Sequence, residues 1–172
     1  PETQYEAYML AQPGVNSYVM YEAARACRRI QPDLFIVYMG NNEVNGPFGA
    51  TVQETNPWQM SLPMIRLRIR LRELRLAQLA AGRGRVPWHA PLEDRHTHIG
   101  HDDPRLRRTE AHYARNLRGI LEAARDAGAA VLFCTVGCNL RDFAPMASFH
   151  RTDLSPGDLE AWEDHYQRGV SL

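Results

Sequence analysis

The fold is decided by the stretch DLFIVYMGNNE, residues 33–43. Its first part, residues 34–39, is an unbroken apolar run rich in β-branched and aromatic residues, and Gly40 follows it. A run of this length and composition is typical of a fully buried strand in a parallel sheet. Glycine lets the backbone turn, and the residues after the turn are polar: Asn41, Asn42 and Glu43. Because ligands of α/β proteins bind just beyond the carboxyl ends of strands, we expect a functional site at this turn.

Helical and strand-like segments alternate along the chain. We expect strands over residues 5–10, 34–39 and 130–135, each an apolar segment, the second and third following a helical one. A strand, a helix and a second strand in that order form a right-handed crossover, which implies a parallel sheet. The sequence therefore predicts an α/β fold, a three-layer α/β/α sandwich with a flavodoxin-like parallel sheet that is incomplete in this chain.

Four helices are expected, and three begin with local signals. Asn16 or Ser17 can cap a helix over residues 18–30, Asp103 before Pro104 caps one that runs to Ala127, and Ser155 before Pro156 caps the last. The remaining helix covers residues 63–81, where arginines alternate with apolar residues but strong helix formers dominate. On the helix that begins at Pro104, His112 and Asn116 share a face, and we interpret them as surface or core polar residues and not as catalysts.

Composition limits the classes of function. The chain has 172 residues, the length of one domain, and a net charge of zero, so no overall field attracts nucleic acid. All 20 basic residues are arginines, which excludes a P-loop, a Schiff-base lysine and a Ser-Lys dyad within the chain. Three cysteines give no disulfide framework. No apolar run reaches the roughly 18 residues that a membrane-spanning helix needs.

Two unusual segments have a functional and a structural interpretation each. The arginine-rich segment, residues 64–85, could bind a membrane surface or a phosphate-bearing partner, although a solvated helix face is the simpler explanation. The irregular segment over residues 82–103 carries four histidines, and three of these could ligate zinc: His96, His98 and His101. Because the spacing fits no standard zinc site, we favour a histidine-rich surface insertion without metal.

The loops at the carboxyl ends of the strands hold further candidates. Phe48 and Trp58 lie in the long loop after Glu43 and could wall a substrate pocket, although aromatic anchors to the core are the favoured interpretation. The loop over residues 136–149 follows the third strand and places Asn139 and Arg141 on the same rim as Asn42. Arg141 could hold an anionic group of a substrate, and a structural pair with Asp142 is the alternative.

Several of these motifs resemble those of the SGNH (GDSL-type) hydrolases. Gly40-Asn41-Asn42-Glu43 resembles the third sequence block of that family, Gly-x-Asn-(Asp/Glu), and Gly14 stands where its second block has a glycine. The segment NLRDFAP, residues 139–145, resembles a loop of large bacterial members that also carry tetratricopeptide repeats. These proteins are esterases and lipases with a Ser-His-Asp triad. The resemblance implies that the Asn42 side chain and the Gly14 backbone N–H form an oxyanion hole, while Gly40, Asn41, Glu43, Asn139 and Arg141 bind substrate or orient the loops.

The catalytic residues of the family are not found in this chain. The family's nucleophile lies upstream of the glycine block, and its Asp-x-x-His lies near its C-terminus. We therefore expect an internal part of a bacterial SGNH hydrolase that supplies oxyanion-hole elements, acts on a small ester without a cofactor, and is inactive by itself. Ser17 is placed to cap a helix, so we do not nominate it as the nucleophile. The alternatives are a non-catalytic α/β interaction module and an acyltransferase of the same fold.

Overall fold

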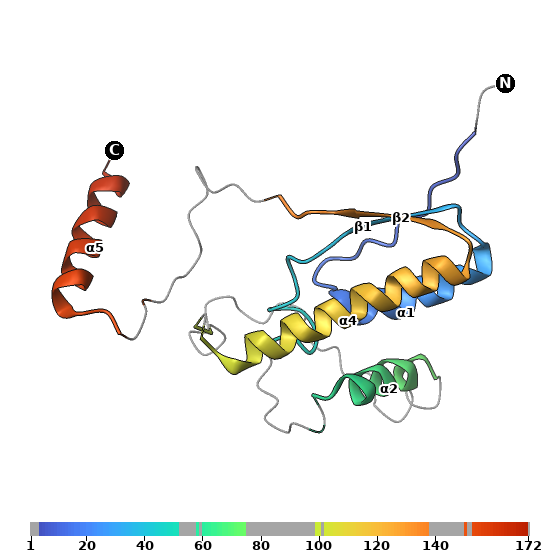
Figure 1. Ribbon diagram of the computed structural model, residues 1–172, viewed down its shortest axis with the longest axis horizontal. Helices are drawn as coiled ribbons and strands as arrows, with labels where there is room; N and C mark the ends of the chain where they lie inside the picture. Colours follow the sequence, from blue (N-terminus) through green and yellow to red (C-terminus); the bar gives the residue numbers. More distant parts are fainter. Residues whose placement is uncertain are drawn as a thin grey trace. The chain divides into compact units, whose positions relative to one another are not determined.

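A computed structural model describes residues 4–51, 58, 60–74, 99–100, 102–137, 150 and 153–171 of the chain (Figure 1). These residues belong to two compact units, residues 1–137 and 138–172. The helices of the first unit are α1 (Ser17–Cys27), the 3-10 turn η1 (Arg28–Ile30), α2 (Leu62–Glu73) and α4 (Pro104–Asp126); its strands are β1 (Leu34–Tyr38) and β2 (Ala130–Cys134). The second unit contains α5 (Pro156–Val170).

β1 and β2 form a parallel two-stranded sheet, which confirms the mixed α/β class. Leu34 lies opposite Ala130 and Tyr38 opposite Cys134. α1 and α4 lie side by side against one face of this sheet (Figure 1). Phe35 and Val37 of β1 point to that face and pack against a core of Ala24, Ile120 and Ala123.

The other face of the sheet is not covered by any described residue of this unit. Leu34, Ile36 and Tyr38 of β1 are exposed, and so is Leu132 of β2. The prediction of a fully buried strand is therefore wrong for the described part of the chain. An apolar run fits burial on both faces, but only the face toward α1 and α4 has helices packed on it.

Residues 5–10 do not form the predicted strand. The segment is extended but pairs with neither β1 nor β2, and Tyr5 and Met9 are almost fully exposed. An isolated extended segment gains no ladder hydrogen bonds, so its apolar residues alone do not make it a strand.

α4 and α5 begin where their local signals predict, whereas α2 ends at Glu73, before the expected end at residue 81, with Leu74 in an extended conformation. The Asp103 side chain accepts a hydrogen bond from the Arg105 N–H and caps α4, and Ser155 caps α5 by accepting from the Asp158 N–H. Both helices begin with the predicted proline. In α4 the buried face is more polar than a simple apolar stripe and consists of Thr109, His112, Asn116, Gly119, Ile120, Ala123 and Ala124.

α2 packs its arginines against the rest of the first unit. The Arg66 guanidinium lies 3.9 Å from the centre of the Tyr21 ring, and Arg70 forms a salt bridge with Glu22 at 3.2 Å. The apolar side of α2 contributes Leu62 and Ile65 to a second core around Tyr18. The arginines Arg66 and Arg70 are therefore packing residues as well as charged ones.

No helix in the described part of the chain is long and apolar enough to cross a membrane.

Candidate functional site

Beyond the carboxyl end of β1, Asn42 binds the turn that contains Gly14. Gly14 has φ +77° and stands third in a four-residue turn that the Val15 N–H closes onto the Gln12 carbonyl at 3.4 Å. Proline second and glycine third are the residues that a type II turn prefers. The Asn42 Nδ2 donates to the Val15 carbonyl oxygen at 3.0 Å. Asn42 is thus bonded to the residue that follows Gly14, and Gly14 and Asn42 are 28 positions apart in the sequence.

Asn42 has donor capacity beyond that bond. A carboxamide carries two N–H groups, and the bond to the Val15 oxygen uses one of them. Asn42 is half-buried, whereas Asn41 is exposed. The hydrogen bond that closes the turn uses the Val15 N–H and not that of Gly14.

Glu43 is buried and binds the start of α1. Its Oε1 accepts from the Ser17 backbone N–H and its Oε2 from the Ser17 hydroxyl, both at 2.7 Å. A carboxylate at this place satisfies a backbone donor that the helix itself leaves unpaired and complements the positive end of the helix dipole. The predicted capping by an Asn16 or Ser17 side chain is wrong, because Asn16 is the N-cap residue but makes no side-chain cap bond. Glu43 does this from outside the helix.

Gly40 connects β1 to this loop close to α4. The Tyr113 hydroxyl donates to the Met39 carbonyl oxygen at 2.8 Å, which fixes the end of β1 against α4. Burial, together with the nearby Glu43 charge, raises the pKa of the Tyr113 phenol, so this hydroxyl stays protonated as a donor. The predicted rim residues Asn139 and Arg141 and the histidines His96, His98 and His101 lie outside the described residues.

A second buried polar pair lies behind the rim. The Tyr18 hydroxyl and His112 Nδ1 are 3.0 Å apart. Burial and the charges of Arg108, Arg115 and Arg66 lower the pKa of His112 to about 4, and burial raises the pKa of Tyr18 to about 12. At neutral pH this hydrogen bond therefore joins a neutral phenol and a neutral imidazole.

The partners of these buried polar groups were not predicted from the sequence. Asn116 is fully buried and its Nδ2 donates to the Ser17 hydroxyl oxygen at 3.0 Å. The spacing of His112, Asn116, Ile120 and Ala123 along α4 shows that they share a helix face, but it does not identify their partners. Buried polar side chains need hydrogen-bond partners, and those of His112 and Asn116 come from α1 and α2.

Ser17 and His112 are not arranged as a catalytic pair. Both are buried, Ser17 completely, and each has a different hydrogen-bond partner. A nucleophile must reach a substrate, so the exclusion of Ser17 as the nucleophile agrees with its position. Phe48 is a core residue that packs edge-on against Tyr18, with ring centres 5.9 Å apart, and Trp58 is exposed.

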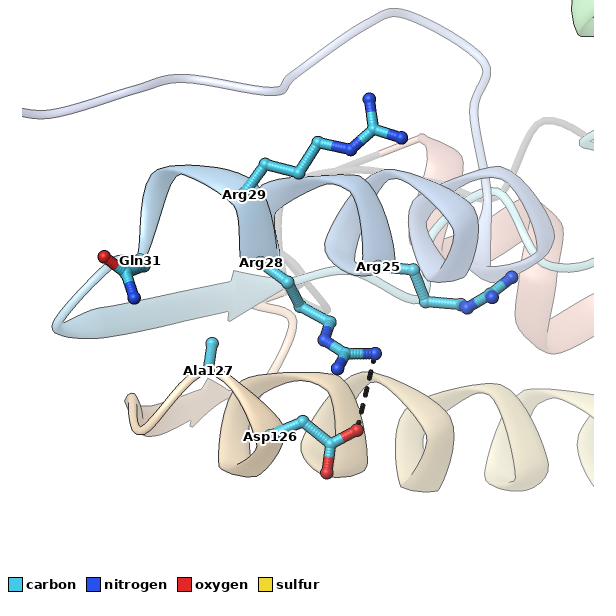
Figure 2. A pocket seen from close by; sticks show the side chains of 6 residues that line it. All are labelled: Arg25, Arg28, Arg29, Gln31, Asp126 and Ala127. Atoms are coloured by element: carbon cyan, nitrogen blue, oxygen red, sulfur yellow. Dashed lines mark ion pairs between the residues drawn. The ribbon is translucent and has the colours of Figure 1, made fainter.

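An open pocket lies at the other end of α1 (Figure 2), lined by Arg25, Arg28, Arg29, Gln31, Asp126 and Ala127. Arg28 and Asp126 form an ion pair across it at 3.5 Å. The C-terminal ends of α1–η1 and α4 meet there, and helix C-termini carry partial negative charge. The arginines complement these helix ends, so their presence does not require an anionic ligand.

In the described residues no group of three or more histidine, cysteine or acidic side chains is close enough to hold a metal ion. Comparisons of the chain with family models, curated proteins and solved structures give no match.

Proposed function

We propose that this chain supplies the oxyanion-binding part of a serine ester hydrolase of the SGNH type. The single observation that carries the proposal is the contact between Asn42 and the Gly14 turn at the carboxyl end of β1. Ester hydrolysis passes through a tetrahedral intermediate with a negatively charged oxygen, and donors fixed in advance stabilise that charge. A side-chain amide and a backbone N–H on one rim suit this purpose.

The substrate of the proposed reaction is a small ester, and the residues that attack it lie outside this chain. Glu43 holds the loop that carries Asn42 against α1. In an enzyme that includes these segments, the nucleophilic serine would sit within reach of both Asn42 and Gly14. The proposed role of the chain needs no cofactor and no nucleic acid.

We infer further that the sheet belongs to a three-layer α/β/α sandwich of the flavodoxin-like type. Parallel sheets are normally covered on both faces, and the face formed by Leu34, Ile36 and Leu132 is apolar but exposed. Each strand pairs on one side only within the described residues. Further strands and a second helix layer would account for both features.

A fluorophosphonate probe, which labels activated serines, tests the enzyme assignment. The coding sequence around this chain is recovered first, and the longer protein is exposed to the probe. We expect a Gly-x-Ser turn upstream, an Asp-x-x-His downstream and labelling of that serine. The 172-residue chain by itself should not be labelled and should not hydrolyse p-nitrophenyl esters.

The alternative is a non-catalytic interaction module, favoured by the same exposed apolar face of the sheet. A longer protein without the serine turn, or one that the probe does not label, would support the module and contradict the hydrolase. An acyltransferase would be labelled as well and would differ in transferring the acyl group to an acceptor other than water.

A further inference from the structure

Four polar side chains from four segments form one continuous chain of hydrogen bonds. The Arg66 Nη2 of α2 donates to the Asn116 Oδ1 of α4 at 3.1 Å. The Asn116 Nδ2 donates to the Ser17 Oγ of α1 at 3.0 Å, and the Ser17 hydroxyl donates to the Glu43 Oε2 at 2.7 Å. Asn116 and Ser17 are fully buried, and Glu43 is nearly so.

All three bonds point in the same direction. A guanidinium only donates, so Asn116 must turn its oxygen toward Arg66 and its NH2 toward Ser17. The serine hydroxyl has one proton, and because it accepts from Asn116 it gives that proton to the carboxylate. Donors therefore run without interruption from a cation, Arg66, to an anion, Glu43. The arrangement is an ion pair transmitted through two neutral side chains.

We propose that Arg66 and Asn116 are positioning residues that hold Glu43, and through it Asn42, against the start of α1. Glu43 follows Asn42 directly in the sequence, and it binds Ser17 through both carboxylate oxygens. Asn42 itself binds the Val15 oxygen, two residues before Ser17. If the carboxylate lost its hold on Ser17, the segment that carries Asn42 would lose its bonds to the first residue of α1 and keep the bond of Asn42 to Val15, before the helix.

The hydrogen-bond series from Arg66 to Glu43 depends on Glu43 being ionised. Burial raises the pKa of the Glu43 carboxyl, whereas the two hydrogen bonds from Ser17 oppose that rise. The charge of Glu43 contributes to the raised pKa values of the Tyr18 and Tyr113 phenols, and both phenols are protonated and neutral at pH 7. Arg108 lies near Tyr18 and His112, and the imidazole is neutral. Arg66 is the cation that the hydrogen bonds connect to Glu43.

Arg66 is well fixed for this role. Its guanidinium lies 3.9 Å from the centre of the Tyr21 ring of α1, an attractive cation–π contact. Arg70, one turn further along α2, forms a more exposed salt bridge with Glu22. Arg70 is therefore a matched control for Arg66. Both arginines lie on α2, but only Arg66 takes part in the hydrogen-bond series that ends at Glu43.

Carboxyl NMR of the complete 172-residue chain tests the proposal. The Glu43 carboxyl carbon is followed from pH 3 to 8 in the wild type and in R66M, N116A and R70M. We expect R66M and N116A to raise the pKa of Glu43 by roughly half a pH unit or more, because its charged form loses support. R70M should leave that pKa unchanged. Equal values in R66M and R70M would overturn the proposal.

The chemical shifts of the Asn42 side-chain amide provide a second measurement. A loss of packing alone would not make these shifts change with pH together with the protonation of Glu43. In the wild type they should stay constant above the pKa of Glu43, and in R66M they should begin to change at the higher pH at which Glu43 takes up its proton. If R66M does not fold, R66Q replaces it, because glutamine keeps a donor but has no charge. An unchanged Glu43 pKa in R66Q would equally refute the proposal.

The catalytic meaning of this positioning rests on the proposed function, but the NMR result does not. A raised Glu43 pKa in R66M, combined with unchanged ester turnover of Asn42→Ala in the longer protein, would support the positioning role of Arg66 and contradict the proposed hydrolase function. An unchanged Glu43 pKa in R66M, with turnover lost in Asn42→Ala, would contradict the positioning role and support the hydrolase function.

Discussion

At the scale of single residues, the first unit depends on buried polar groups whose partners are distant in the sequence. Glu43 caps α1 from 26 positions away, and Asn116 reaches Ser17 across 99 positions. Buried donors and acceptors without partners would each destabilise the fold by about 1–3 kcal/mol, so these bonds help to specify one packing of α1 against α4. Local sequence patterns could not predict these hydrogen bonds, because nothing in the sequence around one partner indicates which distant residue the other is.

His112 should make the first unit sensitive to acid. The unfolded chain takes up a proton on this histidine near its ordinary pKa of 6.5, whereas the folded protein does so only near 4. The unfolded state therefore binds more protons between these values, and stability falls as the pH is lowered from about 6.5 to about 4. A difference of this size corresponds to at most about 3 kcal/mol.

Urea denaturation of the wild type and of His112→Gln at a series of pH values measures this effect. The variant keeps an acceptor for the Tyr18 hydroxyl but does not titrate, so we expect it to lose less stability than the wild type between pH 6.5 and 4. His165→Gln, on the exposed face of α5, is the control and should behave as the wild type. Parallel curves for the wild type and His112→Gln would contradict the assignment of a buried neutral imidazole.

At the scale of secondary-structure elements, local signals place the helices well. Asp103 with Pro104 and Ser155 with Pro156 mark the starts of α4 and α5 correctly, because capping is a contact between neighbouring residues. Strands need partners elsewhere in the chain, and for that reason the apolar residues 5–10 misled while residues 34–39 did not. Whether His112 and Asn116 of α4 lie in the core or at the surface stayed open for a related reason, because their partners Tyr18, Ser17 and Arg66 come from α1 and α2.

Gly119 sets how closely α1 and α4 approach. A Cβ atom at this position would lie 2.4 Å from Tyr21 Cε2, far closer than real Cβ contacts. We expect Gly119→Ala to destabilise the first unit by about 1–2 kcal/mol, because overpacking outweighs the better helix propensity of alanine.

Thermal and urea denaturation measure this change, with Arg118→Ala on the exposed side of the same helix as the control. A Gly119→Ala variant that is as stable as the Arg118→Ala control would show that α1 and α4 do not pack as closely as described.

At the scale of the whole molecule, the amino-acid pattern correctly predicted that both faces of the sheet are apolar. It did not predict that one of these faces is exposed. Residues 34–39 have the composition of a strand buried on both faces, and the described residues cover one. The pairing of Asn42 with Gly14 was expected only from the resemblance to the SGNH hydrolases, and the structure shows the bond of Asn42 to the neighbouring Val15. The Arg66–Asn116–Ser17–Glu43 series was not, because it joins four segments that no single local pattern connects.

The exposed face should bind the hydrophobic dye ANS. Ile36 and Leu132 are adjacent across the two strands and both are exposed, so the double variant Ile36→Ser/Leu132→Ser should reduce dye fluorescence several-fold. Leu71→Ser, an exposed position on α2, is the control and should change fluorescence little. Equal dye binding by all three proteins would mean that this face is covered in solution.

The most direct test of the oxyanion-binding claim is the turnover of Asn42→Ala in the longer protein that carries the nucleophile. Loss of the amide removes one donor to the developing charge, so we expect kcat to fall roughly 100- to 1,000-fold. The lost bond to Val15 should reduce the free energy of unfolding by only about 1 kcal/mol. Asn45→Ala, at an exposed position of the same loop, should keep near-normal turnover. Turnover of Asn42→Ala equal to that of Asn45→Ala would contradict the claim.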